Sequence, residues 1–128
     1  MSNEDSTAER VTSEASRPRT TFAVQFVFEV EQRADAETIR AYLPHPDVPG
    51  VSRTGYRSYV ESAGLRLPTT GGSVPYYDRR DAEQLYETLA ETDDVDDSVA
   101  AGTLALRRFD GGTALDEEPV VVAATEFP

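Results

Sequence analysis

The chain has no cysteine, no lysine and no tryptophan, and it has a single histidine and a single methionine. Without cysteine there can be no disulfide, no thiol nucleophile and no zinc site of the cysteine type. Without lysine there can be no phosphate-binding loop of the Walker type, no Schiff base and no lysine base. These absences exclude several common classes of enzyme before any motif is considered.

Long apolar runs are also missing. No stretch of the sequence approaches the roughly eighteen apolar residues that span a bilayer. Residues 1–6 are polar and acidic, whereas a secretory signal needs a cationic region followed by an apolar one. We therefore expect a cytoplasmic protein with no membrane association.

Positive charge is scarce, because 24 carboxylates stand against 12 cations and give a formal net charge of -12 at pH 7. Charge of this size strains a compact state in dilute buffer, whereas molar salt shortens the Debye length to about 3 Å and removes most of the strain. The composition resembles that of cytoplasmic proteins from extremely halophilic archaea. An acidic surface of that kind is an adaptation to the solvent, so it does not indicate a basic partner.

The fold expected from the sequence begins after a tail. Residues 1–19 are polar and charged with scarcely an apolar side chain, which predicts a disordered tail. Residues 20–128 suffice for one α+β domain with one hydrophobic core. Its strongest element is a strand that starts at Thr20, in which apolar residues recur at period two: Phe22, Val24, Phe26, Phe28 and Val30.

Two helices and further strands are expected along the rest of the chain. Asp35 is predicted to cap a helix over residues 36–43, and Asp81, with Gln84, a helix that ends near Glu91. The strands are predicted at residues 56–61, 65–67, 98–109 and 119–127, with loops at 44–55, 69–73 and 93–97. The order βαββαβ plus one extra strand predicts a ferredoxin-like sandwich, with the last strand at an edge or paired with another chain.

Motifs that carry chemistry are sparse. His45 is the only imidazole, and Pro44 and Pro46 place it in a rigid loop, where an exposed histidine is commoner than a catalyst. Residues 93–97 lack the glycine and the glutamate that a calcium loop requires at later positions. No glycine pattern indicates a dinucleotide site. We therefore expect no metal and no cofactor, and these motifs do not indicate an enzyme.

One compositional anomaly stands out, because the charge balance inverts between residues 53 and 80. Arginines and tyrosines interleave there, and guanidinium groups beside phenol rings can bind phosphate or carboxylate bidentately and stack on flat rings. The candidate ligand-binding residues are Arg53, Tyr56, Arg57, Tyr77, Arg79 and Arg80. In the other interpretation, Arg57 and Arg66 pair with carboxylates across a hairpin, while Tyr59 and Tyr76 cover the sheet edge or a dimer contact.

Three hypotheses for function follow. The first is a non-catalytic interaction module that self-associates through its sheet as a homodimer, or binds another protein, because residues 120–122 form an apolar terminal strand. The second is a regulatory protein that binds a small anion, a nucleotide or RNA through the arginine and tyrosine residues, although molar salt removes the counterion-release term. The third is a small enzyme that uses His45 or a carboxylate.

Overall fold

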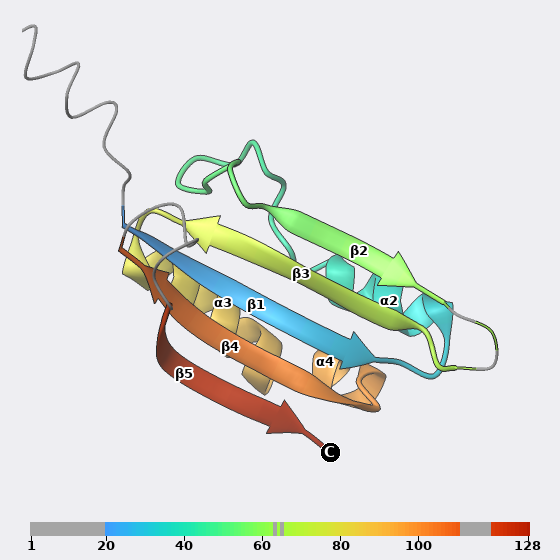
Figure 1. Ribbon diagram of the computed structural model, residues 1–128. Helices are drawn as coiled ribbons and strands as arrows, with labels where there is room; N and C mark the ends of the chain where they lie inside the picture. Colours follow the sequence, from blue (N-terminus) through green and yellow to red (C-terminus); the bar gives the residue numbers. More distant parts are fainter. Residues whose placement is uncertain (1–19, 63, 65, 111–118) are drawn as a thin grey trace, which may run out of the picture.

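A computed structural model describes residues 20–62, 64, 66–110 and 119–128 (Figure 1). The tail expected at residues 1–19 lies outside the described residues. The elements are, in chain order, β1 (Thr21–Glu29), α2 (Arg33–Arg40), β2 (Arg57–Glu61), β3 (Thr69–Tyr76), α3 (Arg79–Glu91), α4 (Asp93–Ser98), β4 (Ala101–Phe109) and β5 (Val120–Phe127). No helix within these described ranges is long and apolar enough to cross a membrane.

The described strands form one five-stranded sheet in the order β2-β3-β1-β4-β5, and every neighbouring pair is antiparallel. The helices α2, α3 and α4 all lie on one face of this sheet (Figure 1). No described element covers the opposite face, which is turned toward the viewer in Figure 1. The expected α+β class is therefore confirmed, with three helices in the described part of the chain rather than two.

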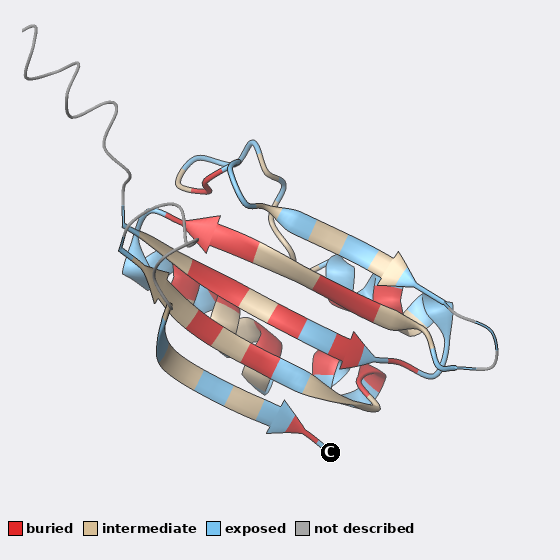
Figure 2. Cartoon of the chain, in the orientation of Figure 1, coloured by how far each residue is buried: buried red, intermediate tan, exposed pale blue. Residues whose placement is uncertain are grey.

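The core lies between the sheet and the helices. β1 is central because its alternating apolar residues Val24, Phe26 and Phe28, at most 2% exposed, point to the helices. From the helical side Ile39 and Leu89 meet them, both fully buried. Figure 2 shows the buried residues as bands along β1, β3 and β4. Each such side chain stabilises the fold by about 1.5 to 3 kcal/mol.

Both predicted helices begin earlier in the structure than the sequence indicated. α2 starts at Arg33 after Gln32, and Asp35 serves inside its first turn, where its carboxylate accepts the Gln32 N–H at 3.1 Å. α3 starts at Arg79, and the carboxylate of Asp78 accepts the Arg80 N–H at 2.8 Å. The prediction that Asp35 and Asp81 are the caps was therefore wrong. Both lie in the first helical turn, where an acidic residue is as favourable as at the cap.

The loop predicted at residues 69–73 and the strand predicted at 65–67 were wrong. β3 occupies Thr69–Tyr76 instead, and residues 66–68 are not a strand. The sequence misled because Gly71 and Gly72 indicate a loop. In the structure both glycines lie within β3, where groups of β2 come too close to leave room for a side chain. A Cβ at Gly71 would collide with the Tyr59 ring, and a Cβ at Gly72 with the Arg57 carbonyl oxygen.

The acidic segment predicted as a solvated connector is the helix α4. Its carboxylates lie at the helix start, where the helix dipole favours negative charge. Its Val95 is fully buried and joins the core, so the segment has one apolar anchor among its acidic residues. β4 accordingly begins at Ala101 rather than at Ser98, whereas β5 begins close to the predicted position.

Candidate functional site

We call the sheet surface opposite the helices the open face. Side chains alternate along a strand, and directly paired residues on neighbouring strands share a face. Because Phe26 and Phe28 point to the helices, Gln25 and Val27 on β1 belong to the open face. The pairing then assigns further residues to it: Arg57 and Tyr59 on β2, Gly71 and Ser73 on β3, Thr103, Ala105 and Arg107 on β4, and Val121, Ala124 and Glu126 on β5.

A hollow of about 260 Å³ lies on the open face. It forms because the middle of the face carries small side chains, such as Ser73 and Ala105, while longer ones rise on either side of them. Tyr59 forms one wall, with its ring lying over Gly71. The residues that line the hollow are Gln25, Phe26, Val27, Arg57, Tyr59, Gly72, Ser73, Thr103, Ala105 and Arg107.

A chain of hydrogen bonds crosses the middle of the open face. Nη1 of Arg107 donates to Oε1 of Gln25 at 3.1 Å, and Nε2 of Gln25 donates to Oγ of Ser73 at 3.3 Å. These bonds hold the guanidinium against the sheet. Nε of Arg107 is buried and has no hydrogen-bond partner among the described residues.

The two arginines that line the hollow lack the ion pairs that Arg53, Arg79 and Arg108 form with described carboxylates. Arg108, the next residue along β4, pairs with Asp110 at 3.0 Å. Neither Arg57 nor Arg107 has a carboxylate within ion-pair distance in the described part of the chain. The hollow therefore combines two guanidinium groups, neither paired with a described carboxylate, with neutral hydrogen-bonding side chains.

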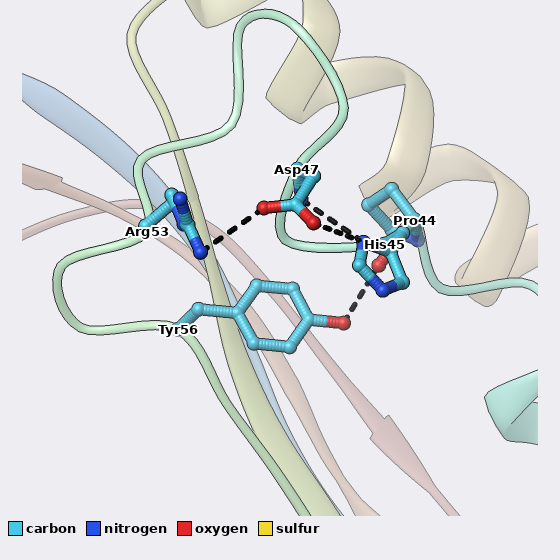
Figure 3. A network of polar contacts seen from close by, with 5 residues as sticks. All are labelled: Pro44, His45, Asp47, Arg53 and Tyr56. Carbon is cyan, nitrogen blue, oxygen red and sulfur yellow. Dashed lines mark hydrogen bonds and ion pairs between the residues drawn. The ribbon is translucent and has the colours of Figure 1, made fainter.

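The structure places Arg53 and Tyr56 in a loop network rather than on the open face (Figure 3). Arg53 forms an exposed ion pair with Asp47 at 3.2 Å, and the backbone N–H of Asp47 donates to Nδ1 of His45 at 3.1 Å. The Tyr56 hydroxyl donates to the Pro44 carbonyl oxygen at 2.7 Å. Burial raises the pKa of Tyr56, and the nearby Arg40 opposes this shift. These contacts bind the irregular segment to itself.

The remaining candidate residues lie around the start of α3. The backbone N–H of Tyr77 donates to the Gly50 carbonyl oxygen at 3.0 Å, and Arg79 pairs with Glu83 one turn along the helix at 2.6 Å. Arg80 is exposed in the first turn. Of the six candidates, only Arg57 lines the hollow. A ligand-binding role for the others remains a prediction.

Sequence reasoning missed four polar residues of the hollow: Gln25, Ser73, Thr103 and Arg107. The period-two pattern already placed Gln25 opposite the phenylalanines, and the same alternation applied to residues 101–109 places Arg107 opposite Leu104 and Leu106. What the pattern lacked was the strand order. β1 lies between β3 and β4, and this arrangement brings Ser73, Gln25 and Arg107 together.

A second hollow lies on the helical side, between α2, the loop at residues 44–46 and β2. It has a volume of about 550 Å³, and Arg40, His45 and Glu37 contribute to its lining. Ser58 also lines it, and its buried Oγ has no hydrogen-bond partner among the residues that the structure describes. Because Glu37 is part of its lining, this hollow is a weaker anion site than the one on the open face, whose lining has no acidic residue. Within the described ranges, no group of three or more His, Cys, Asp or Glu residues could hold a metal ion.

Comparisons of this chain with protein-family models, with curated proteins and with solved structures found no match. Arguments about its function therefore depend on its own residues.

Proposed function

We propose that the chain is a non-catalytic interaction module that self-associates through the open face of its sheet. The observation that carries this proposal is the exposure of apolar side chains on that face: Val27 is 47% exposed, Tyr59 36% and Val121 55%. Val27 lies on the central strand. On the solvated face of an antiparallel sheet this position usually carries a polar residue, and an apolar residue there is usually covered by another element or chain. A second copy of the chain would cover all three residues.

The size of the open face supports this proposal. Strands lie about 4.8 Å apart and rise about 3.3 Å per residue. Five strands of 5 to 9 residues therefore present roughly 550 Å². Two copies packed face to face would bury about 1,100 Å² in total, which exceeds the roughly 1,000 Å² expected of a specific interface.

The charges on the face are also self-complementary. Arg57 lies on β2, at one edge of the sheet, and Glu126 lies on β5, at the other edge. A two-fold axis parallel to the strands places β2 of one copy over β5 of its partner. Arg57 then lies opposite the row that contains Ala124, two residues from Glu126. A two-fold contact forms each such pair twice.

The oligomeric state tests this proposal. Sedimentation velocity in about 2 M KCl should give a dimer for the native chain and a monomer for Val27→Glu, because this variant buries an unpaired charge at the contact. Val48→Glu is the matched control, since Val48 is 42% exposed but lies in a loop away from the face. A native chain that stays monomeric at high concentration would overturn the proposal.

Deleting residues 120–127 is not a clean test of self-association. Phe127 is 9% exposed and packs against Phe28 in the core. A truncated chain would therefore lose stability whether or not the native chain is a dimer. Substitutions on the open face avoid this difficulty, because they leave the core intact.

We further infer a ferredoxin-like sandwich in a protein of the cytoplasm of a halophile. The order β2-β3-β1-β4, with α2 and α3 on one face, supports the fold, and α4 and β5 are additions to it. The net charge of -12 supports the setting, since it needs molar salt for screening. The fold inference is tested by the backbone assignments and long-range contacts of a solution structure, in which β1 must pair with both β3 and β4.

A further inference from the structure

Arg107 is held in an unusual environment for a cation in this protein. The chain has twice as many carboxylates as arginines, 24 against 12. Nevertheless, the guanidinium of Arg107 lies against the sheet with a neutral partner, Gln25, and its buried Nε has no acceptor in the described part of the chain. A buried donor of a charged group costs stability unless an acceptor is supplied. An anion in the hollow would give the guanidinium of Arg107 the counter-charge that no described carboxylate supplies.

The other groups of the hollow select for the same charge. No Asp or Glu side chain is among the residues that line it. Ser73 Oγ already accepts from Gln25, so its own hydrogen is free to donate. Thr103, on β4 at the other side of β1, carries an exposed hydroxyl. Arg57 adds a second guanidinium from the opposite side. The polar lining thus offers donors to a ligand and no negative charge.

The spacing of the two arginines indicates the shape of the ligand. Arg57 is on β2 and Arg107 on β4, three strand spacings apart and two residues apart along the strands, which separates their backbones by about 16 Å. Side chains that reach inward from both strands bracket an elongated molecule better than a single small ion. Val27 and Ala105 lie between them and present apolar atoms, while the Tyr59 ring forms a flat wall.

We propose that this hollow binds a small organic dianion of the dicarboxylate class. One carboxylate is held by Arg107, the other by Arg57, and the hydrocarbon middle lies over Val27 and Ala105. Bidentate guanidinium–carboxylate pairs depend on direction as well as on charge, so they discriminate against the chloride that abounds in molar salt. Every group of the site comes from one chain, so the monomer is the binding form, and a second copy packed on the open face would cover the hollow.

Isothermal titration calorimetry in about 2 M KCl tests the site, with succinate and glutarate as ligands and acetate as the one-ended comparison. We expect either dicarboxylate to bind, acetate to bind at least about tenfold more weakly, and Arg57→Gln and Arg107→Gln each to weaken dicarboxylate binding by about tenfold or more. Arg108→Gln is the matched control, because Arg108 is the next residue on β4 but pairs with Asp110 and does not line the hollow.

The outcomes separate the site from self-association. No heat with either dicarboxylate, equal binding of acetate, or equal binding by Arg57→Gln and Arg108→Gln would overturn the site. Should Arg107→Gln fail to fold, the exposed Arg57 still provides the decisive variant. Sedimentation of the same samples reports the oligomeric state independently. Because a second copy would cover the hollow, the titration is read where sedimentation shows a monomer, and a monomer that binds no dicarboxylate refutes the site. A chain that stays monomeric at high concentration and binds succinate refutes self-association alone.

Discussion

The ring of Phe127 on β5 meets the ring of Phe28 on β1 edge-on, with centroids 4.9 Å apart and an interplanar angle of 68°. These strands are not neighbours, because β4 lies between them. The residue of β4 that pairs with both is Gly102, which has no side chain to separate the two rings. The edge strand β5 is thereby joined to the central strand through the core.

Replacing Gly102 with alanine should destabilise the fold by about 2 to 3 kcal/mol, because the new Cβ would collide with the Val27 carbonyl oxygen and with Phe28. Urea unfolding at high salt measures this loss. Gly64→Ala is the control. Both glycines have a positive φ, 157° at Gly102 and 61° at Gly64, but a Cβ at Gly64 meets nothing within 4 Å. Equal losses in the two variants would show that backbone strain alone, and not crowding, determines the choice of glycine.

Gly71 and Tyr59 should be coupled in stability. Gly71→Ala places a Cβ in the space of the Tyr59 ring and forces the ring off the sheet, so we expect a loss of about 1 to 3 kcal/mol. In a Tyr59→Ala background the same substitution should cost much less, because the obstructing ring is gone. A double-mutant cycle by urea unfolding measures the coupling. Additive losses would contradict the packing of the ring on Gly71.

The sequence predicted those parts of the fold that depend on local pattern. β1 followed from its alternating phenylalanines, and α2 and α3 followed from their apolar stripes, with ends shifted by a few residues because Asp35 and Asp81 fit more than one helical position. β3 could not be predicted, because its two glycines are explained only by Tyr59 and Arg57 on a neighbouring strand. α4 was not predicted, because its one fully buried apolar residue, Val95, is flanked in the sequence by aspartates and gives no apolar stripe.

The candidate site was predictable to a smaller degree. Arg57 was named because it lies in an arginine-rich stretch of sequence, and that stretch divides in space between a loop, the open face and the start of α3. Arg107 lies far along the chain from Arg57, and it reaches Gln25 only because β1 pairs with both β3 and β4. Pairing between distant strands is not encoded in local periodicity, so the convergence required the structure.

Salt should stabilise this protein, and one contribution to this effect should come from the junction of α3 and α4. Glu91 ends α3, where the helix dipole disfavours negative charge, and Asp93 begins α4, where the dipole favours it. In low salt, Glu91→Gln should raise the melting temperature by roughly 2 °C, while Asp93→Asn should not raise it. Both effects should shrink in about 2 M KCl. A gain for Glu91→Gln that persists there would contradict an electrostatic origin.

Alkaline pH should destabilise the fold through its buried phenols. Burial, helped by the nearby Asp81 and Tyr56, raises the pKa of Tyr76 to about 12 from an ordinary value of 10.0. Because the folded pKa is raised, the stabilising contribution is complete below pH 10 and is lost as the pH rises from 10 toward 12. The pKa values of Tyr42 and Tyr56 are also raised, by a hydrogen bond to Asp94 and by burial respectively, and act in the same direction.

Tyr76→Phe removes the largest of these contributions. We expect its free energy of unfolding to fall less steeply than that of the native chain between pH 10 and pH 12, the range set by the pKa of Tyr76 in the unfolded and folded states. Tyr59→Phe, at an exposed position, is the control for the loss of one phenol. Urea unfolding at a series of pH values compares the slopes. If Tyr76→Phe and the native chain lost stability in parallel, the Tyr76 hydroxyl would have to be as accessible to water in the fold as in the unfolded chain, which its burial beside Val51 opposes.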